Sequence, residues 1–79
     1  MTLAHTQYLV EHRPPAPGRG RRRPPGRVHL AASLAEARLI AAELAGMDDQ
    51  ASAVMAGLGR APEGELAGPF GLVRFAPAA

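Results

Sequence analysis

The sequence predicts a small α+β domain: a three-stranded antiparallel sheet with two helices on one face, in the order β-β-α-α-β. Three observations predict this fold. One helix, residues 33–46, has both ends marked by capping residues. Short segments typical of strands lie on both sides of it. The chain of 79 residues is long enough for a single domain only, and we expect residues 1–79 to form it.

The first predicted strand covers residues 5–13, HTQYLVEHR. Side chains alternate along it, so that Tyr8 and Val10 share one face while Leu9 and Glu11 share the other. Tyr8 and Val10 are also residue types that favour strands. We expect the Tyr8/Val10 face to meet the helices.

Residues 14–26, PPAPGRGRRRPPG, are low in complexity and contain no large hydrophobic side chain. Proline cannot donate the backbone hydrogen bond that a central strand needs. The segment is therefore predicted to be a flexible Arg/Pro/Gly-rich loop, longer than a tight hairpin connection. Residues 27–31, RVHLA, form the second predicted strand, with Val28 and Leu30 on one face.

The first predicted helix begins after Ser33, whose side chain can cap it, and Glu36 stands at the spacing of a capping box. Gly46 supplies the left-handed residue that commonly ends a helix. The helical period predicts one apolar stripe centred on Ile40, with Leu39 outside it. The stripe consists of Leu34, Ala37, Ile40, Ala41 and Leu44.

A second helix is predicted after Asp48 or Asp49, either of which can serve as its N-cap. Gly57 and Gly59 are predicted to end it. Residues 60–68, RAPEGELAG, are predicted to be a polar connector rich in turns. Two successive helices return the chain to the sheet, so that a strand after them runs antiparallel to the second strand.

The third predicted strand covers residues 69–76, PFGLVRFA, and residues 77–79 are predicted to be a frayed end. This strand partly resembles the longer signature strand of RNA-recognition-motif domains over eight residues. Gly68, Pro69 and Leu72 replace the basic residue, the first glycine and one base-stacking aromatic of that signature. We therefore interpret the segment as an ordinary core strand, in which aromatic residues are favoured.

Positive charge is concentrated near the N-terminus. Residues 1–32 contain six arginines against Glu11 alone, a balance of +5, whereas residues 33–79 contain three arginines against six carboxylates, a balance of −3. Guanidinium groups pair with phosphates at any relevant pH. The loop therefore predicts non-specific nucleic-acid binding. The candidate residues are Arg13, Arg19, Arg21, Arg22, Arg23 and Arg27.

Two alternatives to nucleic-acid binding remain open. The absence of lysine and the abundance of alanine, glycine and proline are typical of codon bias, in which case the loop is a solvated linker. The protein would then be a protein–protein adaptor or a homodimeric accessory protein. A small sheet leaves one face uncovered, and we expect Leu9 to be exposed there with Val73 or Phe75. We expect the protein to self-associate as a homodimer through that face or through an edge strand, because the core is thin and one side is uncovered.

Other classes of function find little support in the sequence. Cysteine is absent, which excludes disulfides and thiolate metal ligands. The histidines at positions 5, 12 and 29 do not supply the three or four ligands that zinc requires. Ser33 is explained as a helix cap, and no nucleophile stands with a base and an orienting group. We therefore expect a non-enzymatic protein without metal, cofactor or small-molecule substrate.

The predicted compartment is the cytoplasm. The N-terminal residues lack the basic and continuous apolar regions of a signal peptide. The longest apolar-rich run, residues 30–47, is interrupted by Glu36, Arg38 and Glu43, so it is not expected to span a membrane.

Overall fold

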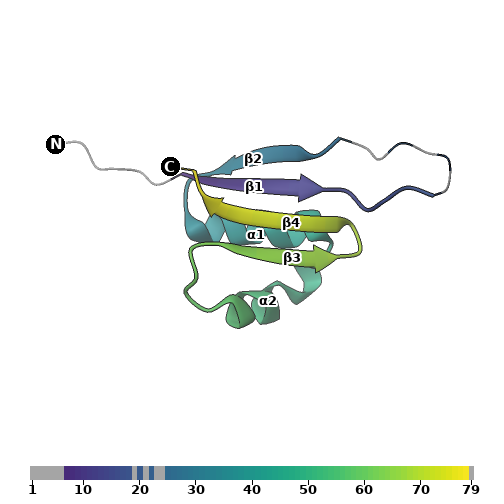
Figure 1. The fold of residues 1–79 in the computed structure, drawn as a ribbon. Coiled ribbons are helices and arrows are strands. Elements are labelled where there is room, and N and C mark those ends of the chain that lie inside the picture. The colour runs from purple at the N-terminus through teal and green to yellow at the C-terminus, as the bar shows by residue number, and fades with distance from the viewer. Residues whose placement is uncertain (1–6, 19, 21, 23–24, 79) are drawn as a thin grey trace.

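The computed structural model describes residues 7–18, 20, 22 and 25–78 (Figure 1). The strands in this part of the chain form one antiparallel sheet in the order β2-β1-β4-β3. Helix α1 lies behind β1 and β4, and α2 continues the helical layer beside β3. The elements are β1 (Tyr8–Arg13), β2 (Arg27–Ala31), α1 (Leu34–Ala45), the 3₁₀ turn η1 (Asp48–Gln50), α2 (Ala51–Leu58), β3 (Gly64–Gly68) and β4 (Gly71–Pro77).

The predicted α+β class is confirmed, but the prediction of three strands was wrong because it missed β3. The connector expected at residues 60–68 contains this strand, which pairs with β4 in a hairpin closed by Gly68 and Gly71. Its sequence, GELAG, has one large apolar residue, Leu66, and glycine at both ends. Glycine is depleted in strands, so local propensity argues against the assignment. Pairing with β4 overrides that propensity.

The last strand also pairs differently from the prediction. We expected it to lie antiparallel to β2, but β4 lies between β1 and β3. Phe70 belongs to the turn before β4, and its side chain is 60% exposed. In the register between β1 and β4, Val10 stands opposite Phe75 and Leu9 stands opposite Ala76.

That register corrects the predicted composition of the open face. Val73 and Phe75 are buried together with Val10, on the side that meets the helices. They are therefore not exposed with Leu9, as we expected. Leu72 and Ala76 share the open face with Leu9 instead, because successive residues of a strand alternate between faces.

Helix α1 begins and ends where the capping residues predict. The Ser33 hydroxyl accepts a hydrogen bond from the Glu36 N–H at 3.1 Å, and the Glu36 carboxylate accepts one from the Ala32 N–H at 3.2 Å. Gly46 follows in the left-handed region, with φ of 81°. Both ends of α1 are therefore fixed by local hydrogen bonds and backbone geometry.

The core is narrow, and alanines form the surface of α1 that contacts the sheet. Ile40, Leu34 and Leu44 pack partly buried against the core, so the true centre of the stripe is displaced from Ile40 toward the alanines. Small side chains allow the helix to approach the sheet closely. Leu39 is 53% exposed, as its position outside the stripe predicts. The fully enclosed core consists of Val10, Ala31, Ala37, Ala41, Ala42, Ala45, Leu66, Val73 and Phe75.

The C-terminal end of the sheet extends further than expected. Strand β4 continues to Pro77, and the Ala78 N–H donates a hydrogen bond to the Gln7 carbonyl oxygen at 2.8 Å. Residues 77 and 78 of the predicted frayed end are thus tied to the sheet. None of the helices described by the structure combines the length and the apolar character that crossing a bilayer would require.

Arg38 connects α1 to the connector that leads into β3. One terminal guanidinium nitrogen, Nη2, donates a hydrogen bond to the Ala61 carbonyl oxygen at 2.6 Å. The guanidinium carbon lies 6.0 Å from the centre of the Phe75 ring, at the range of a cation–π contact. Arg38 is half-buried, and its alkyl stem contributes to packing as well.

Replacing Arg38 by methionine is expected to lower the free energy of unfolding by about 2 kcal/mol, because the variant keeps an apolar stem but loses the charged donor. The melting temperature should fall by roughly 10 °C for a domain of this size. Thermal melts followed by circular dichroism measure this fall in the melting temperature. Arg60→Met is the matched control, since Arg60 is exposed, and it should leave the melting temperature within about 2 °C.

Candidate nucleic-acid interface

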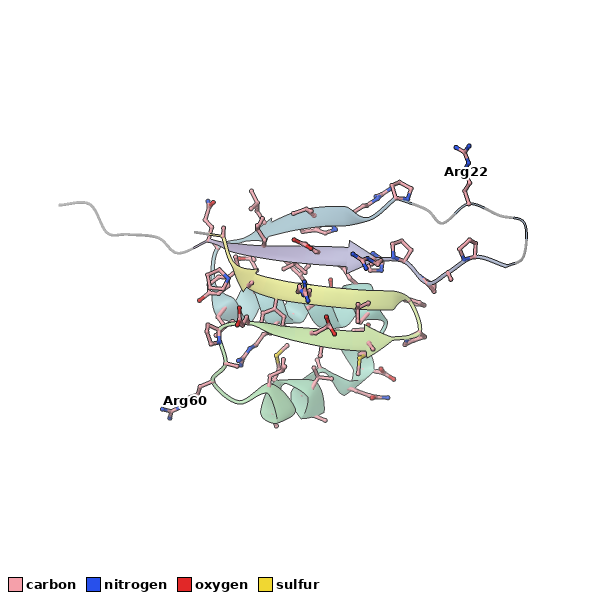
Figure 2. All side chains as sticks on the ribbon, in the orientation of Figure 1. Arg22 and Arg60 are labelled. Atoms are coloured by element: carbon pink, nitrogen blue, oxygen red, sulfur yellow. The ribbon has the colours of Figure 1, made fainter. Side chains whose placement is uncertain are left out.

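The six predicted basic residues all fall within residues 13–27 of the sequence, a segment that we name the arginine arm. Arg13 is the last residue of β1, and Arg27 is the first residue of β2. Arg22 is exposed and points away from the body of the protein (Figure 2). The predicted residues Arg19, Arg21 and Arg23 lie outside the described part of the chain.

The described residues of the arm between β1 and β2 extend beyond the end of the sheet (Figure 1). His12 stands opposite Arg27 in the β1–β2 register, so both ends of the arm leave the sheet at one place. The arm contains six arginines and no acidic residue. The rest of the chain contains three arginines and seven carboxylates, a balance of −4. A polyanion is therefore attracted to the arm and repelled by the body.

The base of the arm is anchored to the rest of the fold through the β3–β4 turn. The His12 ring nitrogen Nε2 lies 2.8 Å from the Phe70 carbonyl oxygen, which can only accept, so this nitrogen is the donor. The Phe70 N–H in turn donates to the Ala45 carbonyl oxygen at the end of α1, at 3.1 Å. One chain of hydrogen bonds therefore links β1, the turn and α1 beneath the arm.

A hollow of about 190 Å³ opens on the uncovered face of the sheet at the base of the arm. Three arginines line it, Arg13, Arg27 and Arg74, together with the carboxylates of Glu11 and Glu65. Its other lining residues are His12, Gly26, Val28 and Leu72.

The hollow is a poor anion site because its charges nearly balance. The Arg74 Nε lies 3.6 Å from a Glu65 carboxylate oxygen, so part of its positive charge is already compensated. Glu11 stands directly opposite Arg74 in the β1–β4 register. The positive charge that no carboxylate offsets therefore lies mainly on the arm, of which only Arg13 and Arg27 reach the hollow among the described residues. Sequence reasoning did not include Arg74 in any site, although strand alternation places it on the same face as Glu11.

The histidines do not converge on one another. His29 stands opposite Val10, and His12 stands opposite Arg27, so the two rings are not direct cross-strand partners. His5 lies outside the described residues. Across the ranges that the structure describes, no three or more side chains of histidine or carboxylate type come together as metal ligands would.

The chain matches no protein-family model, and no curated protein or solved structure is significantly similar to it.

Proposed function

We propose that this protein is a non-catalytic accessory protein that contacts nucleic acid without sequence specificity through the arginine arm. One observation supports the proposal above the others. The sequence of the arm contains six arginines and no carboxylate; Arg13 and Arg27 lie at its anchored base in the sheet, and Arg22 is exposed beyond the sheet.

The chemistry of the arm fits the phosphate backbone better than the bases. Each guanidinium can donate two parallel hydrogen bonds to a phosphate and keeps its charge at any physiological pH. Reading bases requires a helix or strand held rigidly in a groove, with side chains aimed at the base edges. The arm carries arginine, proline, glycine and alanine only, so it supplies charge without base selection.

The prolines of the arm reduce the entropic cost of binding. Proline restricts its own φ angle and the conformation of the residue before it. Five of the residues between Arg13 and Arg27 are prolines, so fewer backbone conformations are lost when the arm lies along a polyanion. About four of the six arginines can reach phosphates at once, which predicts a slope of log affinity against log salt of roughly −3 to −4.

Two matched variants test the proposal. Arg22→Gln and Arg60→Gln each remove one exposed positive charge, but they lie at opposite ends of the molecule (Figure 2). Loss of one phosphate contact should make the slope less steep by roughly 1 for Arg22→Gln. Arg60→Gln should leave it unchanged. Fluorescence anisotropy on duplex DNA and on single-stranded RNA, at several salt concentrations, measures both slopes.

A triple substitution of Arg21, Arg22 and Arg23 by glutamine should abolish most binding near physiological salt and leave the melting temperature unchanged. Equal binding by the triple variant and the parent would contradict the proposal, as would absence of binding by both. The protein–protein adaptor would then be the better interpretation. It is favoured by one observation, the exposure of Val28 and Leu30 on the open face, each 61% exposed.

A further inference from the structure

The face of the sheet opposite the helices has an ordered pattern of charge. In the middle row across the strands, Glu11 stands opposite Arg74, and Arg74 stands opposite Glu65. Val28 completes this row on β2. Aliphatic side chains lie on both sides of the charged row. They are Leu30, Leu9 and Ala76 toward the end of the sheet away from the arm, and Leu72 and Ala67 toward the end near the arm. Arg13 on β1 stands opposite Leu72 in the row near the arm.

We propose that this open face binds a second copy of the chain, face to face, with the two-fold axis along the strands between β1 and β4. The inference is independent of the nucleic-acid proposal. Rotation about that axis places β1 of one copy over β4 of the other. Glu11 of each copy then faces Arg74 of the other, which gives two equivalent ion pairs at the centre of the interface.

The same rotation brings aliphatic residues together beside the ion pairs. Leu9 of one copy lies over Ala76 of the other, because these two residues are cross-strand partners within each copy. An arrangement with the axis across the strands would instead set Glu11 against Glu11 and Arg74 against Arg74. Like charges in contact are strongly unfavourable, so the charged row selects the first arrangement.

The size of the sheet sets the strength of this association. Four strands at about 4.8 Å spacing and five or six residues at about 3.3 Å give a footprint of roughly 350 Å² per copy. Allowing for the corrugation of side chains, the accessible area buried by both copies together is about 1,200 Å², at the lower limit for a specific interface. We expect a weak, reversible dimer, with a dissociation constant on the order of micromolar, as is typical of small interfaces.

The two arginine arms leave the face-to-face dimer at the same end, because a two-fold axis along the strands preserves the direction of each strand. Dimerisation through the edge strand β2 would instead run the two sheets antiparallel and send the arms in opposite directions. The position of the arms therefore distinguishes the two assemblies.

Charge reversal tests the interface in the absence of nucleic acid. Glu11→Arg alone and Arg74→Glu alone should each weaken dimerisation about tenfold or more, since each creates two like-charge contacts. The double variant restores opposite charges and should recover most of the affinity. Sedimentation equilibrium across micromolar concentrations measures the constants, with circular dichroism melts to verify folding. Leu39→Glu, on the exposed side of α1, is the control and should leave dimerisation unchanged.

A distance measurement tests the orientation. The chain has no cysteine, so Ala16→Cys on the arm accepts a single spin label per copy. The face-to-face dimer places the two labels roughly 10–20 Å apart, and the β2 edge dimer places them roughly 40 Å apart. Dipolar electron paramagnetic resonance distinguishes these distances. Three results would overturn the proposal. The first is a monomeric protein at 100 µM, about a hundred times the expected dissociation constant. The second is a double variant that dimerises no better than the single variants, and the third is a pair of labels at the long distance.

Discussion

Replacing Phe75 by alanine is expected to remove about 3–5 kcal/mol from the free energy of unfolding. Phe75 is completely buried, and it is the largest of the enclosed side chains. Its ring lies beneath the Arg38 guanidinium and against Gly64 of the neighbouring strand, so its loss leaves a cavity that several elements border. A domain of this length has about 4–12 kcal/mol of stability in total. The variant should therefore lose a large share of its stability and melt at a much lower temperature than the parent.

Phe70→Ala provides the matched control, because it deletes the same atoms from a side chain that is 60% exposed. We expect it to cost less than about 1 kcal/mol. Urea unfolding monitored by circular dichroism compares both variants with the parent. Similar midpoints for the two variants would show that the core is not centred on Phe75.

Replacing Gly68 by alanine is expected to cost about 3 kcal/mol or more, by overpacking rather than by a cavity. A Cβ atom at this position would overlap with the Ala45 carbonyl oxygen and lie 3.0 Å from the Met47 side chain. The Ala45 carbonyl cannot move freely, because it accepts the hydrogen bond from the Phe70 N–H. The substitution therefore separates the β3–β4 turn from the end of α1. The melting temperature should fall by roughly 12 °C or more.

Gly57→Ala is the matched control for this prediction. Gly57 lies within α2, and a Cβ atom there meets no other atom within 4 Å. Alanine favours helix over glycine by about 0.8–1.0 kcal/mol, so this variant should melt at a higher temperature than the parent. Equal melting temperatures for Gly68→Ala and the parent would show that the turn does not pack against α1 as described.

The elements with explicit local signals could be predicted from the sequence. Strand β2 and helix α1 have the predicted bounds because strand alternation, Ser33 and Gly46 are local features. Strand β3 could not be predicted in this way, since one leucine between glycines carries no periodic signal. It exists because β4, the next strand in the chain, supplies its hydrogen-bonding partner, and the residues of β3 alone do not indicate that pairing.

The candidate site also has a part that the sequence alone indicates and a part that depends on the strand order. The basic character of residues 13–27 is compositional, so the sequence alone indicates it. The hollow beneath the arm and the pairing of Glu11 with Arg74 depend on which strands become neighbours. We predicted β4 beside β2, and that order separates Glu11 from Arg74. The strand order in the sheet was therefore the missing information.

We propose that the arginine arm is the element that binds nucleic acid. The most direct test replaces residues 14–25 by Asn-Gly, a pair that favours the tight turn of a β-hairpin. The shortened loop lowers the entropic cost of closing the β1–β2 hairpin, so the melting temperature should be equal to or slightly above that of the parent. Anisotropy titrations with duplex DNA and single-stranded RNA should then show no binding at physiological salt. A folded arm-deleted protein that binds either nucleic acid as tightly as the parent would contradict the claim.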